Sequence, residues 1–303
     1  MTSRTLRTVV LGNFDGLHRG HQQLIALGRQ IADQYGEELA VFTFYPQMQQ
    51  VLDPAFCYLL TEQQKLERFA QLQVDVVETV PFEASIAQLS PEAFVRTILV
   101  ERLRASHVVV GFNYSFGYRG AGDPQLLQQL AEPYGITVTV MEPCYVDGEI
   151  VSSSAVRNYL REGNVEKAKA MLGYAYSLEG PVLTGNQIGR TIGFPTANIG
   201  PARNILLPAN GVYAALTYVD GKAYPGILNV GLRPTIANSV GINIEVNLFD
   251  FDADIYGKQI RTEFHYFLRR EQKFSGLDQL KAQLEQDRAR TRKLFADTAI
   301  YAN

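Results

Sequence analysis

The fold follows from one stretch near the N-terminus, which reads Val9-Val10-Leu11-Gly12-Asn13-Phe14-Asp15-Gly16-Leu17-His18-Arg19-Gly20-His21. Three apolar residues precede a glycine-containing turn, and an amphipathic run begins near Gln22. This order predicts a strand, a tight turn and a helix. His18 and His21 are three residues apart, a spacing that puts both side chains on one face of the first helical turn.

The same stretch favours the binding of an anion. The first N–H groups of a helix have no partner within the helix, and its dipole is positive at this end. Gly20 has no side chain that would keep a phosphate at a distance, so we expect the α-phosphate of a nucleotide here. An ordinary capped helix start is the alternative. Zinc is disfavoured because His107 and His265 are far away in sequence and the two cysteines are isolated.

As far as Gly173, short apolar runs alternate with longer amphipathic runs. This pattern predicts the α/β class, with a doubly wound, Rossmann-like parallel sheet. The expected strands are Thr8–Leu11, Leu39–Phe44, Val74–Val80, His107–Val110 and Ile136–Met141. The expected helices lie near Gln22–Tyr35, Glu62–Gln71, Pro91–Arg102, Pro124–Tyr134, Ser154–Leu160 and Val165–Leu172. Such sheets bind ligands at the carboxyl ends of their strands, which is where the histidine turn begins.

After Gly173 the apolar runs follow one another without helices, separated by turn residues such as Asp220-Gly221. The expected strands are Tyr176–Thr184, Val212–Val219, Ala223–Val230, Ile242–Phe249 and Ile260–Leu268, followed by a helix over Leu277–Phe295. This half therefore predicts a small antiparallel β-barrel with a C-terminal helix. We place the domain boundary after residue 174, giving domains over residues 1–174 and 175–303.

Composition excludes several classes of function. The chain has 303 residues, 46% of them hydrophobic, and a net charge of −3. Because no dense Lys/Arg run is present, we expect no nucleic-acid partner. Two widely separated cysteines are typical of the reducing cytosol, and we expect neither a signal peptide nor a membrane span.

Two further segments of the first half carry possible ligand contacts. The loop Gly111–Gly122 combines aromatic rings, which could flank a flat heterocycle, with glycines and Arg119. A surface loop packed by its own aromatic side chains is the alternative. The run Ser152-Ser153-Ser154-Ala155-Val156-Arg157 puts hydroxyls and an arginine at a helix start, which suits a second phosphate clamp or only a cap.

The second half contains one motif and one strand residue of interest. Residues 189–199 read Gly-Arg-Thr-Ile-Gly-Phe-Pro-Thr-Ala-Asn-Ile and lack the lysine of a P-loop. Thr196 and Asn198 supply oxygens that suit a hydrated Mg²⁺, although a Pro/Gly turn between strands has the same composition. Glu245 lies on the polar face of an alternating strand, so it is either solvent-facing or catalytic.

The three segments of the first half resemble the adenylyltransferase motifs of bacterial bifunctional riboflavin kinase/FAD synthetases. Ser154 and Val156 stand where that family usually has Thr and Ile. Tyr45-Pro46-Gln47-Met48 departs from the usual acidic residue, Pro, His, Pro. The Gly-Phe-Pro-Thr-Ala-Asn motif, the later Glu245, and the tail Leu268–Phe274 resemble the riboflavin kinase module, with Asn247 where a histidine is frequent.

The resemblance implies two reactions: ATP-dependent phosphorylation of riboflavin to FMN, then adenylyl transfer from ATP to FMN, which gives FAD and pyrophosphate. It implies catalytic roles for His18, His21 and Arg157 in the adenylyl transfer and for Glu245 as the base of the kinase. Implied ligand residues are, for ATP and phosphate, Gly12, Phe14, Asp15, Gly16, Gly20, Ser153, Ser154, Gly189 and Arg190; for flavin, Asn113, Phe116 and Arg119; and for Mg²⁺, Thr196 and Asn198.

The implied partners are riboflavin, FMN and ATP, with no obligatory protein partner. Two other interpretations stay open. A monofunctional nucleotidylyltransferase would use the barrel as an accessory module, and a flavin or nucleotide sensor would bind without releasing pyrophosphate. A class I aminoacyl-tRNA synthetase shares a His-x-Gly-His element, but its lysine-rich loop and basic surface are not visible in this sequence.

Overall fold

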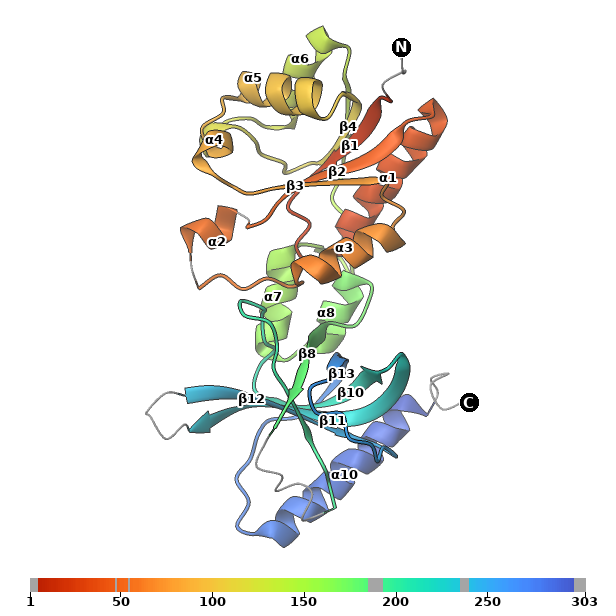
Figure 1. Ribbon diagram of the computed structural model, residues 1–303, viewed down its shortest axis with the longest axis vertical. Coiled ribbons are helices and arrows are strands. Elements are labelled where there is room, and N and C mark those ends of the chain that lie inside the picture. The colour runs from red at the N-terminus through yellow and green to blue at the C-terminus, as the bar shows by residue number, and fades with distance from the viewer. Residues whose placement is uncertain (1–4, 47, 54, 185–192, 235–239, 297–303) are drawn as a thin grey trace. The chain divides into compact units, whose positions relative to one another are not determined.

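The computed structural model describes residues 5–46, 48–53, 55–184, 193–234 and 240–296. The chain divides into two compact units, residues 1–153 and 154–303, whose elements are labelled in Figure 1. Each unit is described by itself below.

The first unit is built on a five-stranded parallel sheet. Its strands are β1 (Arg7–Leu11), β2 (Glu38–Phe44), β3 (Val76–Val80), β4 (Ala105–Gly111) and β5 (Thr137–Met141). Their order is β3-β2-β1-β4-β5, and every neighbouring pair is parallel. The order reverses between β1 and β4. The turns after these two strands therefore flank the switch point, where doubly wound sheets bind their ligands.

Helices cover both faces of this sheet. On one face lies α1 (Arg19–Tyr35), so close that a Cβ on Gly28 would come within 2.5 Å of a Val10 methyl group. On the other face, α5 (Pro91–Phe94) continues as the π-helical η1 (Val95–Arg102) and packs beside α6 (Pro124–Ala131). The remaining helices are α2 (Met48–Leu52), α3 (Glu62–Gln71), α4 (Ala84–Ala87) and the short η2 (Tyr118–Gly120) and η3 (Glu132–Tyr134).

Local sequence explains where these helices start. Thr61 caps α3, and with Gln64 it forms a reciprocal capping box. Ser90 caps α5 and is followed by Pro91 at the first helical position, as the sequence predicts. A two-stranded hairpin, β6 (Tyr145–Val146) with β7 (Glu149–Ile150), closes the unit and was not expected.

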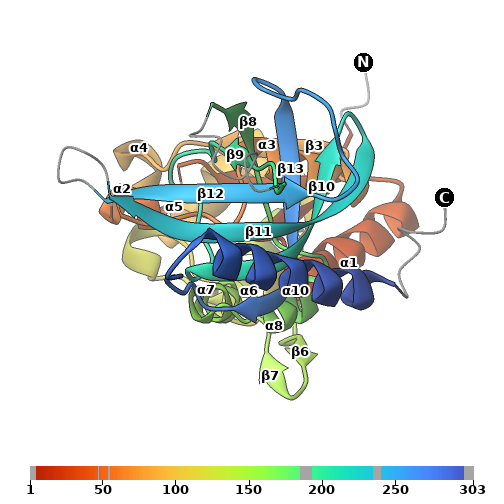
Figure 2. The same cartoon turned by 90° about the horizontal axis from the view of Figure 1, so that it is seen from below.

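The second unit contains a closed antiparallel barrel in the order β10-β11-β12-β9-β8-β13. Its strands are β8 (Ser177–Leu183), β9 (Ala197–Ile199), β10 (Gly211–Val219), β11 (Lys222–Pro234), β12 (Val240–Leu248) and β13 (Gln259–Arg269). The C-terminal helix α10 (Leu277–Phe295) lies beside β11, as Figure 2 shows. Phe249, Phe295 and Ile227 belong to the apolar cluster between the barrel and this helix.

Two helices precede the barrel, α7 (Ser153–Glu162) and α8 (Val165–Leu172). They belong to the same compact unit as the barrel, because α8 packs on β13 and Gly163 approaches the Phe267 ring. The second compact unit thus begins at Ser154, well before the boundary expected after residue 174. The parallel sheet with helices on both faces and the closed antiparallel barrel confirm the predicted fold class.

Candidate active sites

The turn after β1 has an unusual backbone. Phe14, Gly16 and Leu17 have φ values of 52°, 79° and 37°. Glycine adopts this left-handed region freely, whereas the two other residues are strained there. Such strain collects at functional sites because the surrounding structure must hold it in place.

Two glycines of this turn leave room for aromatic rings. A Cβ on Gly12 would lie 3.1 Å from the Phe14 ring. A Cβ on Gly20 would lie 3.3 Å from the His18 ring and 3.5 Å from the Cβ of Cys144. Side chains at these two positions would therefore push against the rings of the turn.

His18 and His21 form a stacked pair at the start of α1. His18 is the N-cap, and its Nδ1 accepts a hydrogen bond from the backbone N–H of His21 at 3.3 Å. The ring centroids are 3.7 Å apart and the planes differ by 13°. Because Nδ1 accepts a hydrogen bond, a neutral His18 carries its proton on Nε2. This Nε2–H group can donate a hydrogen bond to a ligand.

Both imidazoles are neutral at physiological pH. Burial lowers the pKa of His18 to about 4. The pKa of His21 is also lowered, first by burial and then by the charges of His18 and Lys65. The Nδ1 atom of His21 is buried, with no hydrogen-bond partner in the described part of the chain. The pair thus offers ring N–H groups rather than fixed positive charge.

Asp15 and Ser153 tie the turn to its surroundings. The Asp15 carboxylate is 4% exposed and accepts the Leu59 N–H at 3.0 Å. The Asp15 carbonyl accepts a hydrogen bond of 2.8 Å from the Ser153 hydroxyl. Ser154 and Arg157 follow on α7, in the second compact unit. The structure thus gathers at one turn most of the residues expected for phosphate: Gly12, Phe14, Asp15, Gly16, His18, Gly20, His21 and Ser153.

The loop after β4 is held mainly by its own aromatic side chains. Phe116 is 5% exposed and packs against Phe94 and Tyr114, at centroid distances of 5.3 and 6.1 Å. Asn113 and Arg119 are exposed, and the Arg119 guanidinium lies over the Tyr118 ring. Phe116 therefore supports the loop, while Asn113 and Arg119 leave their polar groups available at the same edge of the sheet as the histidines.

The segment after β2 is only partly described. Gln47 lies outside the described residues. Tyr45 has its ring 5.6 Å from that of Tyr58, and its N–H donates to the Val80 carbonyl at 3.0 Å. Tyr45 is 37% exposed, so part of its ring faces solvent.

Lys65 was not expected at this site. It lies on α3 and is 6% exposed, and its Nζ donates to the Asn13 carbonyl and to the Thr43 hydroxyl. Burial lowers its pKa to about 8. The signal was present in the sequence, since Lys65 is four residues from the buried Phe69 and so shares the inward face of α3.

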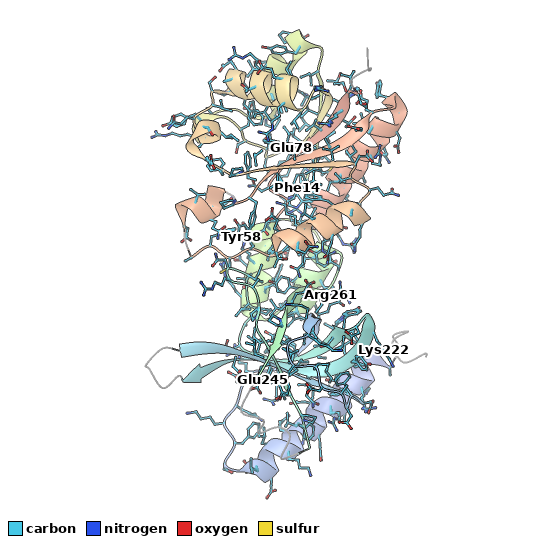
Figure 3. All side chains as sticks on the ribbon, in the orientation of Figure 1. Phe14, Tyr58, Glu78, Lys222, Glu245 and Arg261 are labelled. Atoms are coloured by element: carbon cyan, nitrogen blue, oxygen red, sulfur yellow. The ribbon has the colours of Figure 1, made fainter. Side chains whose placement is uncertain are left out.

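In the barrel, three polar side chains form a row across neighbouring strands. Glu245 on β12 is directly opposite Asn198 on β9 and Asn229 on β11. Directly opposite residues in antiparallel strands point to the same face. All three side chains are half-buried, and Figure 3 labels Glu245 on β12. The Asn229 amide donates to the Glu271 carboxylate at 3.2 Å, and neither Asn229 nor this contact was expected.

The motif that leads into β9 is fixed by buried neighbours. Phe194 is 3% exposed, and the Arg288 guanidinium of α10 lies 4.3 Å from the centre of its ring. Thr196 is half-buried and lines a cavity of about 450 Å³ with Val182, Val246 and the residues from Phe251 to Tyr256. Gly189 and Arg190 lie outside the described residues.

The donor set around Glu245 fits a hard divalent cation. Thr196 offers a hydroxyl, Asn198 an amide oxygen and Glu245 a carboxylate. Within the described ranges no group of three or more His, Cys, Asp or Glu side chains could hold a metal ion. Mg²⁺ at phosphoryl-transfer sites commonly takes only one or two protein ligands, with water and substrate phosphates completing the shell.

Two protein families match the two halves of the chain. One described as FAD synthetase matches residues 2–155, and one described as riboflavin kinase matches residues 172–295. No helix in the part of the chain that the structure describes is long and apolar enough to cross a membrane.

The similarity to known proteins extends over nearly the whole length of this chain. The bifunctional riboflavin kinase/FMN adenylyltransferase of Listeria monocytogenes is 39% identical over 96% of this chain and 93% of its own length. The protein of the same description from Bacillus subtilis is 37% identical, with 95% and 92% covered. A solved structure described as a macrolide-efflux protein from Streptococcus pneumoniae superposes with a TM-score of 0.89 at 30% identity, covering 96% and 95% of the two chains.

Proposed function

This chain belongs to the bifunctional riboflavin kinase/FMN adenylyltransferase family, and from that premise we propose how its two sites divide the work. The barrel phosphorylates riboflavin with ATP to give FMN. The parallel-sheet unit transfers the adenylyl group of a second ATP to FMN, which gives FAD and pyrophosphate. The observation that carries the proposal is the stacked His18–His21 pair at the sheet's switch point, in a chain that also carries the Glu245 row.

In the adenylyl transfer, a phosphate oxygen of FMN attacks the α-phosphorus of ATP and pyrophosphate leaves. Ring N–H groups of His18 and His21 donate to the phosphoryl oxygens, where negative charge grows in the transition state. The positive end of the α1 dipole adds to this stabilisation.

Other residues place the two substrates of this reaction. We assign Ser153, Ser154 and Arg157 to the departing phosphates and Asn113 and Arg119 to the flavin side. Phe116 contributes by supporting the loop that carries Asn113 and Arg119. On this view the adenylyltransferase needs α7, so we retain functional domains over residues 1–174 and 175–303.

In the kinase, Glu245 accepts the proton of the riboflavin 5′-hydroxyl, whose oxygen attacks the γ-phosphorus of ATP. Asn198 and Asn229, on either side of Glu245 in the sheet, orient the reacting groups. Gly189 and Arg190 are assigned to the ATP phosphates. The cavity lined by Thr196 and the residues from Phe251 to Tyr256 has the size of a nucleotide or flavin ring system.

Thr196 and Asn198 would hold Mg²⁺ in the barrel, where the ion neutralises phosphate charge when it is bound. The substrates are small molecules, and we propose neither a nucleic-acid nor an obligatory protein partner. Neither Cys57 nor Cys144 forms a disulfide, which supports a location in the reducing cytoplasm.

One incubation tests the whole proposal. The purified chain is given riboflavin, ATP and Mg²⁺, and the flavins are separated by chromatography over time while pyrophosphate is measured. We expect FMN first, then FAD with one pyrophosphate for each FAD. FMN without FAD would contradict the assignment of the first unit, and binding without pyrophosphate release would favour a sensor.

A further inference from the structure

Lys65 joins three separate segments beneath the histidine turn. Its Nζ donates to the Asn13 carbonyl at 3.1 Å and to the Thr43 hydroxyl at 3.0 Å. The Thr43 hydroxyl in turn donates to the same Asn13 carbonyl at 3.2 Å. One carbonyl of the turn thus accepts two hydrogen bonds, one from α3 and one from the end of β2.

Burial of the Lys65 ammonium group in this position costs free energy. The two acceptors are a carbonyl and a hydroxyl, so neither neutralises the ammonium group. Burial lowers the pKa of Lys65, and the carboxylates of Asp15 and Glu62 offset this only in part. Lys65 occupies an inward position of α3 where a methionine side chain would fill similar space without a buried charge.

The turn that Lys65 holds is the strained one. Asn13 directly precedes Phe14, whose φ is 52°. The Phe14 ring lies between Phe69 of α3, at 5.4 Å, and His21, at 5.2 Å. Helix α3 therefore contacts the turn in two ways. Lys65 donates a hydrogen bond to the backbone of the turn, and Phe69 packs against the Phe14 ring, which in turn contacts His21.

We propose that Lys65 is a positioning residue for adenylyl transfer. Through the Asn13 carbonyl it keeps the turn from Gly12 to Leu17 in its left-handed conformation, with the histidine pair and the start of α1 aimed at the ATP phosphates. Its buried charge adds a positive potential behind that site. This inference rests on the function proposed above and extends it to a residue that does not touch substrate.

The charge also acts on the histidines. The ammonium group of Lys65 lowers the pKa of His21 and so helps to keep this ring neutral before ATP binds. The same potential favours an arriving polyphosphate, because low-dielectric surroundings strengthen the attraction.

The test compares Lys65→Met, Lys65→Arg and Thr43→Val in the full chain, with Arg102→Met as a control at the exposed ion pair with Glu78. The kcat and the KM for ATP are measured with FMN as substrate, alongside thermal unfolding and the kinase rate of the same sample. We expect Lys65→Met to lower kcat roughly 10- to 100-fold, as small misplacements of reacting groups do. Thermal stability should be unchanged or higher and the kinase rate unchanged, while Lys65→Arg should recover part of kcat.

Two results would overturn the proposal. One is full adenylyl transfer by Lys65→Met. The other is a loss of transfer that parallels a loss of thermal stability and disappears at low temperature, which would give Lys65 only a structural role. A wild-type chain that makes no FAD would instead refute the proposed function itself, so the two failures are distinguishable.

A pH profile provides a second reading. The charged and titratable groups that face Lys65 are Asp15 and His21 from the turn and α1, and Glu62 on α3. We expect wild-type transfer at saturating ATP to fall as the pH rises through about 8, where Lys65 loses its proton. The fall should be absent in Lys65→Arg, and the same fall in that variant would overturn the role of the charge.

Discussion

The side-chain amide of Asn247 donates a hydrogen bond of 2.7 Å to the carbonyl oxygen of Pro195. Asn247 is 4% exposed, so this bond is made in a nearly dry environment. Its amide oxygen faces the Arg288 guanidinium of α10 at 3.5 Å. The contact fixes the backbone directly before Thr196, the first of the two residues assigned to Mg²⁺. Asn247 thus takes over at least a positional role where the family often has histidine.

Replacement of Asn247 by alanine should therefore lower the kinase activity indirectly, through the backbone before Thr196. With the Pro195 carbonyl released, we expect the kinase kcat/KM for ATP to fall about tenfold or more, the size of one lost buried hydrogen bond. FMN adenylylation should not change. Asn158→Ala, at an exposed position of α7, is the matched control. An Asn247→Ala enzyme with normal kinase kinetics would show that the motif holds its position unaided.

Glu245→Gln keeps the size of the side chain and removes the base. We expect riboflavin phosphorylation to fall roughly 10²- to 10⁴-fold, the usual contribution of a general base, while FMN supplied directly is still converted to FAD. Chromatography of both reactions gives the ratio. Glu263→Gln is the matched control because its carboxylate contacts Tyr218 on β10 and His265 on β13 instead of the row around Glu245. Unchanged kinase turnover would refute the base assignment.

The converse experiment removes His21 and tests the adenylyl transfer. His21→Ala should lower FAD formation about 10²- to 10³-fold, as the loss of a transition-state hydrogen-bond donor does, and leave FMN formation intact. His107→Ala serves as control, because His107 is near the amino end of β4 and binds the Glu37 carboxylate. FAD formation at the wild-type rate in His21→Ala would place the adenylyl site elsewhere.

The sequence predicted some elements to the residue. Helices over Glu62–Gln71, Val165–Leu172 and Leu277–Phe295 match the structure because local periodicity sets their bounds, helped by caps such as Thr61. Strand β9 was missed because Ala197–Ile199 forms part of a motif whose composition indicates a turn. Its strand conformation comes from pairing with β8 and β12, which are distant in sequence.

The site residues show the same difference between local sequence and tertiary packing. Residues of the histidine turn could be named because they are contiguous, and the structure gathers them at one place. Lys65 and Asn229 come from other elements and meet these sites only through tertiary packing. Phe116 shows the converse, since the sequence could not tell a ring that lines a ligand site from one that is 5% exposed and supports the loop.

The lowered pKa of His18 makes the stability of the first unit depend on pH. In the unfolded chain His18 has its ordinary pKa of 6.5, and in the fold its pKa is about 4. Between these values the unfolded state binds more protons, so stability falls as the pH drops below 6.5 and the loss is complete near 4. The full loss from this group is about 3 kcal/mol. His21, whose pKa is also lowered, adds to it in the same direction.

Urea unfolding at about pH 7 and about pH 5 measures this loss, with the first unit followed by pulse proteolysis because the chain has no tryptophan to report on it. His18→Asn keeps a good N-cap and removes the titrating ring, so its stability should change less between the two pH values. Asn164, the N-cap of α8, shows that asparagine caps a helix in this chain. Equal pH dependence in the wild type and in His18→Asn would mean that His18 is not held neutral by burial. Its role as a neutral donor would then have to be replaced by that of an imidazolium ion.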